Sequence, residues 1–216
     1  EWYSTDLYPS ISAALSWLAS WIPFSLEEIL VVSVALALVF IIIAGVRRRD
    51  VFRKIFFRTC EILLWIYVWF YIGWGCNYFR ESIYVRSGVE RQAYDEEVFK
   101  DFIMDYADSL NLAYEALPDD SFYVGFDYFE SLVKDAFAAM PSSAGLSVPR
   151  QWQHPKCLLF NRLYSSVGVM GYVGPFFCET QLNNELLPDQ LYFVYVHEYS
   201  HLLGVSSEDE ANFWAY

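Results

Sequence analysis

Two long apolar runs near the start of the chain restrict its fold more than any other feature. Residues 29–46 carry no charged side chain, and residues 55–75 carry only Arg58 and Glu61. A helix rises 1.5 Å per residue and needs about 20 apolar residues to cross a bilayer, so both runs are long enough to span one. Glu61 is expected to face protein or lipid headgroups. The alternative, two buried helices of a soluble core, is disfavoured by this length.

The segment between the two runs is basic. Together with Arg58, residues 47–54 hold six of the fourteen Lys and Arg residues. Short loops rich in these residues stay in the cytoplasm, which predicts a transmembrane hairpin whose outer ends lie across the membrane. Residues 1–28 lead into the first span. Their helical spacing after Pro9 predicts an interfacial helix on the bilayer or a helix packed on the protein's own core.

The net charge of −13 comes from the remainder of the chain. Residues 77–216 contain 8 basic and 21 acidic side chains. An acidic domain is a poor partner for nucleic acid, which is therefore excluded. The expected organisation is a lead-in at 1–28, two transmembrane helices within 29–76 and an extracytoplasmic domain at 77–216. The chain has no initiator methionine and ends within a helical pattern, so we expect a fragment truncated at both ends.

The outer domain is predicted to be α+β and mainly helical. After an irregular linker from residue 77, helices are expected at 96–117, capped by Asp95, and at 123–140. Gly, Pro and aromatic residues in 156–187 favour short strands, with Pro175 at an edge or bend. A bridge between Cys157 and Cys178 is permitted outside the cytoplasm, but spacing alone leaves it open. His154, a lone histidine in a loop, is interpreted as a surface residue rather than a ligand.

The segment "DQLYFVYVHEYSHLLG" carries the chemistry. It predicts a helix that Asp189 caps and that Gly204 ends in the left-handed conformation. His197 and His201 are one turn apart, so both imidazoles leave the same face, as two Zn²⁺ ligands require. Glu198 is turned by about 100° from His197. It is suited to take a proton from a metal-bound water as general base.

A catalytic zinc needs a third protein ligand and an open position. In "GVSSEDEAN" the choices are Glu208, Asp209 and Glu210. Ser207 and Glu210 have the spacing of a capping box, which gives Glu210 a structural role. Glu208 remains, on the same helix face as Asn212, which is suited to orient a histidine ligand. The oxyanion-stabilising group is left open among three candidates. They are Tyr172, Tyr195 and Tyr199.

At these residues the chain resembles a domain-of-unknown-function family of bacterial multi-spanning membrane proteins with an outer HExxH metalloprotease-like domain. The matching stretches are "WYSTDLYP", "IPFS", "WGCNYFR", "GYVGPFFCETQLN" and "HEYSHLLGVSSEDEANF". In addition, "EDEAN" is similar to the E-x-x-A-D segment of membrane zinc peptidases related to the thermolysin group. There the leading Glu is the third ligand, which corresponds to Glu208. Asn212 stands where those enzymes have Asp, and the interval from His201 to Glu208 is shorter.

These observations predict a transmembrane hairpin that carries a zincin-like domain. The expected function is zinc-dependent hydrolysis of peptide or protein substrates, in the bacterial inner membrane with the catalytic domain outside the cytoplasm. His197, His201 and Glu208 would bind Zn²⁺, and Glu198 would activate water. A strand around 170–183 is expected to bind the peptide by strand addition. The alternatives are a non-catalytic scaffold with a vestigial or structural metal site, and a sensor protease in a signalling relay.

Overall fold

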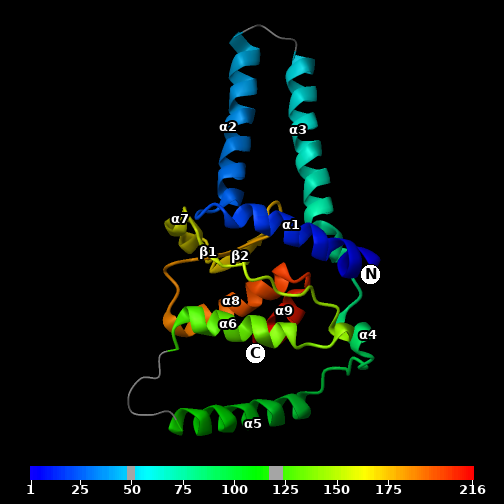
Figure 1. The fold of residues 1–216 in the computed structure, drawn as a ribbon, viewed down its shortest axis with the longest axis vertical. Helices are drawn as coiled ribbons and strands as arrows, with labels where there is room; N and C mark the ends of the chain where they lie inside the picture. Colours follow the sequence, from blue (N-terminus) through cyan, green and yellow to red (C-terminus); the bar gives the residue numbers. More distant parts are fainter. Residues whose placement is uncertain (48–51, 117–123) are drawn as a thin grey trace.

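A long helical hairpin stands on a mixed helical and sheet domain in the computed structural model (Figure 1). The structure describes residues 1–47, 52–116 and 124–216. The hairpin consists of α2 (Leu26–Arg47) and α3 (Phe52–Gly73). The domain below it combines short helices with a small sheet. A mainly helical α+β fold was expected, and this coarse expectation is confirmed.

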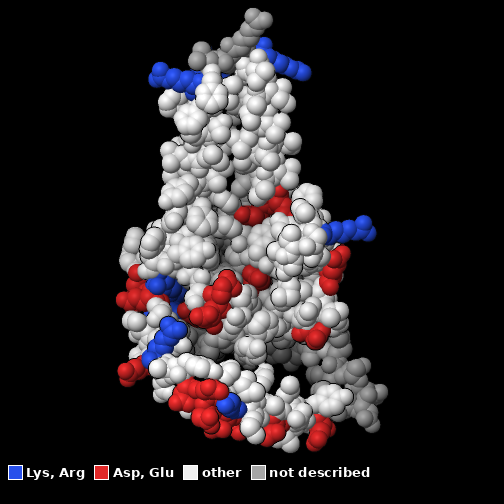
Figure 2. Space-filling model, turned by 180° about the vertical axis from the view of Figure 1, so that it is seen from behind, with Lys and Arg blue, Asp and Glu red and all other residues white. Residues whose placement is uncertain are grey.

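Both hairpin helices present apolar side chains outward. Only 6% of the most apolar window of α2 is buried within the protein, and 0% of that of α3. Figure 2 shows the hairpin as a largely uncharged column with basic side chains near its tip. By length and composition, both helices could cross a membrane. Glu61 is exposed on α3, so lipid headgroups remain its expected surroundings. Residues 48–51 of the predicted cytoplasmic loop lie outside the described residues.

The lead-in segment forms a π-helical turn, η1 (Tyr3–Leu7), followed by α1 (Tyr8–Ser20). One face of α1 packs on the domain, since Tyr8 is buried and its hydroxyl donates to the carbonyl of Leu202 at 2.7 Å. Of the two sequence-based alternatives, packing on the protein's own core is therefore correct for this face. The helix crosses the base of the hairpin (Figure 1), and its opposite face is exposed.

The segment after α3 is more ordered than the expected irregular linker. It contains a 3₁₀ helix, η2 (Gly75–Phe79), and a short helix, α4 (Ile83–Ser87). Between them, Arg80 donates to the carbonyl of Gly204 at 3.0 Å, across most of the sequence. A helix of one or two turns is too short to show a hydrophobic period, which is why the sequence did not reveal these elements.

A long amphipathic helix, α5 (Glu96–Glu115), follows, as predicted. The Asp95 side chain accepts hydrogen bonds from the backbone N–H groups of Glu97 and Val98, at 2.9 and 3.1 Å, so the expected cap is confirmed. Leu117, the last residue of the predicted helix, lies outside the described residues. No residue of α5 is buried, and the helix lies at the end of the domain farthest from the hairpin (Figure 1). The ring of Tyr106, on its apolar face, contacts that of Tyr216 with centroids 6.3 Å apart.

The next helix, α6 (Phe126–Ala138), lies within the predicted range 123–140, whose first residue is outside the described part of the chain. Pro141 follows it and opens a 3₁₀ turn, η3 (Ser142–Ala144). Phe129 and Phe137 of α6 pack on tyrosine rings of the last long helix of the domain. These aromatic contacts hold α6 against the core.

A three-stranded sheet forms the centre of the domain, in the order β1-β3-β2. Its strands are β1 (Lys156–Cys157), β2 (Gly171–Gly174) and β3 (Glu179–Leu182), with β1 parallel and β2 antiparallel to β3. The single strand expected around 170–183 is thus a hairpin, and Pro175 lies in its turn, as predicted. A helix, α7 (Asn161–Ser166), was missed because six residues are too few for a period. Cys157 and Cys178 are both free.

The last two helices are α8 (Pro188–Leu202) and α9 (Glu208–Ala215). α8 packs on the sheet and carries much of the buried core, including Tyr195, Tyr199 and Leu202. The predicted cap is wrong: Leu187 is the N-cap residue, and Asp189 lies inside the first turn, where its charge favours the helix dipole. Gly204 has a φ of 101°, so the expected left-handed end of the helix is confirmed.

Candidate metal centre

The Nε2 atoms of two histidines of α8 lie close together. His197 and His201 are one helical turn apart, and their Nε2 atoms are 3.2 Å apart. Both residues lie near the C-terminal end of α8, where the chain turns through Gly204 into α9. That turn brings α9 back against α8.

The Nδ1 atoms of both histidines have hydrogen-bond partners. Nδ1 of His201 donates to the carbonyl of Val205 at 2.8 Å, and Nδ1 of His197 is 3.0 Å from Oδ1 of Asn212. A carbonyl oxygen can only accept, so Nδ1 of His201 carries the proton and its Nε2 presents a lone pair. Burial lowers the pKa of His201, which keeps the ring neutral. The contact of Asn212 is the one anticipated from its place one turn after Glu208.

Glu208, the first residue of α9, completes the group. Its carboxylate oxygens lie 3.1 Å from Nε2 of His197 and 3.6 Å from Nε2 of His201. The three ligand atoms lie within 4.8 Å of one another. For tetrahedral Zn²⁺ with bonds of about 2.0–2.1 Å, neighbouring ligand atoms are about 3.3 Å apart. The two Nε2 atoms are separated by about this distance, and so is each Nε2 from one oxygen of Glu208, a different oxygen for each histidine. The Glu208 side chain is 75% exposed, so the group is open to solvent on that side.

The structure gives Glu210 a different role from the one predicted. Ser207 is the N-cap residue of α9, but its side chain makes no capping hydrogen bond, so the capping-box interpretation is wrong. Glu210 instead forms a buried ion pair with Arg86 of α4 and accepts a hydrogen bond from Nε1 of Trp214 at 3.1 Å. It therefore faces away from the histidines, and the structure brings Glu208, rather than Glu210, to them.

Glu198 lies beside this group, between α8 and the sheet. Its side chain is buried, and burial raises its pKa to about 8, with the nearby Glu208 adding to the rise. A Cβ atom at Gly171 of β2 would lie 3.0 Å from Cγ of Glu198, so the strand presses directly on this side chain. Among the described residues, no hydrogen bond or ion pair to the Glu198 carboxylate is found. A buried carboxylate without a protein partner is available to a water molecule or a substrate.

None of the three tyrosines considered for the oxyanion lies in a suitable place. Tyr195 and Tyr199 are fully buried and stack on each other in the core, on the side of α8 away from the histidines. Tyr172 follows Gly171 on β2, so it points to the opposite face of the sheet from Glu198. Its ring contacts Tyr164 of α7.

The remaining histidine, His154, is not part of this group. Its side chain is 66% exposed, in agreement with its interpretation as a surface residue. It does have a partner, since Nδ1 is 2.8 Å from a carboxylate oxygen of Glu130. No local pattern pairs His154 with Glu130, which belongs to α6.

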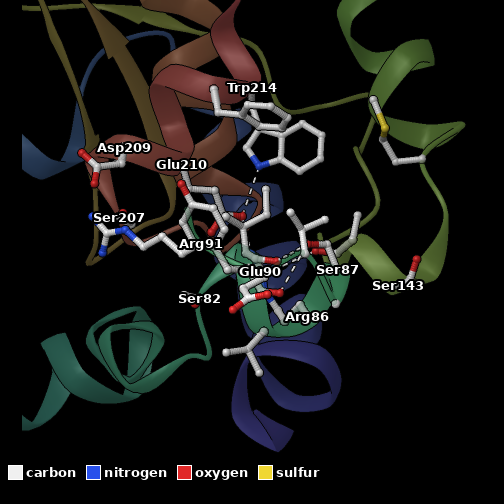
Figure 3. Close-up of a pocket in the computed structure, with 18 of the residues that line it drawn as sticks. Ser82, Arg86, Ser87, Glu90, Arg91, Ser143, Ser207, Asp209, Glu210 and Trp214 are labelled. Atoms are coloured by element: carbon white, nitrogen blue, oxygen red, sulfur yellow. Dashed lines mark hydrogen bonds and ion pairs between the residues drawn. The ribbon is translucent and has the colours of Figure 1, made fainter. Parts of the chain in front are cut away.

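A cavity of about 1000 Å³ lies on the other side of α9. Figure 3 shows Glu210 and Trp214 of α9 on one wall and Arg86 of α4 on another. On a helix with 100° between residues, Glu210 and Trp214 point away from the face that carries Glu208 and Asn212. One face of α9 therefore lies at the candidate metal centre, and the other lines the cavity.

Two contributors to the group were missed by the sequence analysis. Val205 acts through its backbone carbonyl, which no side-chain pattern reveals. Gly171 contributes by the absence of a side chain, next to Glu198. The glycine was visible as a signal, because a glycine inside a strand pattern often marks the close approach of another group.

Comparisons with known proteins identify one family. The family model DUF3810, described as a protein of unknown function, matches residues 3–216. No curated protein and no solved structure matches the chain. The match covers nearly every residue, the hairpin as well as the domain.

Proposed function

We propose that this chain, which belongs to the DUF3810 family of proteins of unknown function, is a membrane-anchored zinc-dependent peptidase. The observation that carries the proposal is the convergence of His197, His201 and Glu208 on one point, with Glu198 beside them. The chain belongs to an uncharacterised family, as the sequence predicted. The peptidase activity, the zinc and the bacterial inner membrane are our inference.

The donor set fits Zn²⁺ on chemical grounds. The Nε2 lone pair of His201 is directed at Nε2 of His197 and at the Glu208 carboxylate. These groups are all acceptors, and they repel one another unless a cation lies between them. Both imidazoles are held from behind by hydrogen bonds at Nδ1, as metal-bound histidines usually are. Two nitrogens and one carboxylate oxygen leave a fourth position open, as in catalytic rather than structural zinc sites.

Glu198 is proposed as the general base. Bound zinc would lower the pKa of a water molecule toward 7 and polarise a substrate carbonyl. Glu198 would accept the proton of the attacking water and pass it to the leaving amine. Its burial suits this role, because a raised pKa brings a carboxylate nearer to the pH at which it must both take and give a proton. Asn212 would orient His197 through its hydrogen bond.

The edge of the sheet is the proposed binding place for the peptide substrate. β2 is an outer strand of the sheet and pairs with β3 on one side. An extended peptide can add to such an edge through backbone hydrogen bonds. Because Gly171 lies against Glu198, a peptide on this edge would run next to the proposed base.

The hairpin suggests on which side of the membrane the site lies. We infer that α2 and α3 cross the bacterial inner membrane with their basic loop in the cytoplasm. The domain, at the other end of the hairpin (Figure 1), would then lie outside the cytoplasm and act on peptides or proteins there.

A comparison of two variants tests the proposal. The full chain is reconstituted with zinc, and metal content and cleavage of a peptide library are measured for the native protein and for Glu198→Gln. We expect one zinc per chain in both and a loss of cleavage of about 10²–10⁴-fold in the variant, because the base is removed while the ligands remain. His154→Ala, which changes the histidine outside the motif, is the matched control and should keep both zinc and activity.

Three other outcomes would contradict the proposal. If zinc binds but the native protein cleaves no peptide, the site is that of a non-catalytic scaffold with a structural metal. If Glu198→Gln loses zinc together with activity, Glu198 is a ligand rather than the base. Full activity of the variant with zinc bound would leave Glu198 without a catalytic role.

A further inference from the structure

The outer face of α1 exposes apolar side chains although the helix lies on a folded domain. Trp17, Leu18 and Trp21 are exposed over 47%, 57% and 71% of their surface. The inner face buries two serines, Ser12 and Ser16, together with Tyr8 and Ala19. A helix on a protein surface in water usually turns its large apolar side chains inward, so the exposure of two tryptophans and a leucine on one face of α1 calls for an explanation.

Specific hydrogen bonds hold α1 in this orientation. The hydroxyl of Ser16 donates to the carbonyl of Ser12 at 2.6 Å and accepts from Nε1 of Trp152 at 3.2 Å. The amide of Gln153 also donates to this hydroxyl, at 3.3 Å. Rotation of the helix to hide its tryptophans would break the contacts with Trp152 and Gln153 and leave buried polar groups unpaired. The exposure of the apolar face therefore belongs to the folded state.

Two further elements expose apolar side chains beside the base of the hairpin. The carboxylate of Glu28, in the first turn of α2, accepts hydrogen bonds from the backbone N–H groups of Leu159 at 2.7 Å and Phe160 at 3.1 Å. These bonds fix the start of α7 next to α2, where Phe160 and Leu163 are 47% and 65% exposed. On the other side, η2 directly follows α3 and exposes 74% of Phe79.

These side chains form what we call the base surface. Its members are exposed apolar residues of α1, η2 and the start of α7. They are Trp17, Leu18, Trp21, Phe79, Phe160 and Leu163. In Figure 1, α1 crosses the lower end of the hairpin and α7 lies beside it.

Three acidic residues near the junction of α2 with the domain are turned inward. Glu27, Glu28 and Glu179 are only 4%, 2% and 4% exposed. Glu179 accepts hydrogen bonds from the backbone of the first turn of α2 and forms an ion pair with Lys156. In a domain with a large negative charge, burial of these carboxylates removes charge from the region where α2 meets the domain.

We propose that the base surface lies in the boundary between the headgroups and the acyl chains of the bilayer that α2 and α3 cross. The occupant is lipid, because the base surface is continuous with the apolar sides of both hairpin helices. Tryptophan is enriched at this depth, and a helix with one apolar face lies there in the membrane plane. The domain is thereby held against the membrane by α1 as well as by its anchors. This inference rests on the proposed transmembrane hairpin.

Photo-crosslinking of the full chain in phosphatidylcholine vesicles tests the proposal. Benzoylphenylalanine replaces one residue at a time, and transfer of a tagged phospholipid to the protein is measured after illumination. The test positions are Leu18 and Leu163. The positive control is Phe40, in the middle of α2 and 70% exposed, and the negative control is Met104, on the outward side of α5 and 66% exposed.

We expect lipid transfer at positions 18 and 163 similar to that at position 40 and well above that at position 104. If lipid transfer occurs at position 40 but is as low at positions 18 and 163 as at position 104, the inference is wrong. The transmembrane hairpin would still stand. Crosslinks from position 18 to a second copy of the chain would also overturn it, in favour of a protein interface. Failure at position 40 would refute the transmembrane hairpin itself, and the present inference with it.

Discussion

Removal of Glu210 tests whether this residue is a helix cap or half of a buried ion pair. The side chains of Arg86 and Glu210 are 5% and 6% exposed. Truncation of one partner leaves the other as a buried charge without compensation, which costs about 3–5 kcal/mol. Loss of a cap costs only about 0.5–2 kcal/mol. We therefore expect Glu210→Ala to lower the free energy of unfolding by about 3–5 kcal/mol.

The assay is urea unfolding of the detergent-solubilised chain, followed by tryptophan fluorescence. Asp209→Ala is the matched control, because Asp209 is the exposed neighbour of Glu210 on α9. Its effect should stay within about 0.5 kcal/mol. The double substitution Arg86→Met with Glu210→Leu should recover most of the lost stability, since it removes both charges and keeps the volume.

A loss of less than about 2 kcal/mol in Glu210→Ala would refute the reasoning, since that is the size of a cap. Failure of the double variant to recover stability would also refute it. The first result would mean that the ion pair contributes less than its burial implies, and the second that the loss does not come from an unpaired buried charge. The folded Glu210→Ala protein should still bind one zinc, because the structure keeps this side chain away from the histidines.

The remaining predictions concern the site and the topology. Glu208→Ala should weaken zinc binding severely in a metal titration, while Asp209→Ala should not; equal losses would contradict the ligand assignment. Asn212→Ala should lower zinc affinity by about 10–100-fold, and an unchanged affinity would show that the hydrogen bond to the imidazole is not needed. Gly171→Ala should reduce kcat with zinc retained, because the added Cβ would lie 2.9 Å from the carbonyl oxygen of Gln181 and 3.0 Å from Cγ of Glu198 and would displace β2 from the base. A cysteine in loop 47–54 should react with an impermeant maleimide only after the cells are permeabilised.

Features that depend on local sequence were predicted well. The hairpin follows from apolar length, and the cap of α5 follows from Asp95 before a periodic segment. The end of α8 follows from Gly204, since a positive φ favours glycine. The spacing of His197 and His201 on one helix fixed their common face before any tertiary contact was known.

Features that depend on distant contacts could not be predicted. Arg86 and Glu210 are 124 positions apart, and no local pattern pairs them. The spacing of Ser207 and Glu210 suggested a capping box, but the buried ion pair takes the carboxylate instead. The preference for Glu208 over Glu210 thus depended partly on a capping box that Ser207 does not form. The face shared by Glu208 and Asn212 was the sounder reason, since it depends only on helix geometry.

X-ray absorption at the zinc edge tests the central claim most directly. For the zinc-loaded full chain we predict two imidazole nitrogens at about 2.0–2.1 Å, one carboxylate oxygen at about 2.0–2.2 Å and one exchangeable light ligand. In Glu208→Ala the protein-derived oxygen should disappear while the imidazole signals remain in whatever zinc is still bound. A sulfur neighbour at about 2.3 Å, an imidazole signal that survives His197→Ala unchanged, or failure to bind stoichiometric zinc would contradict the account.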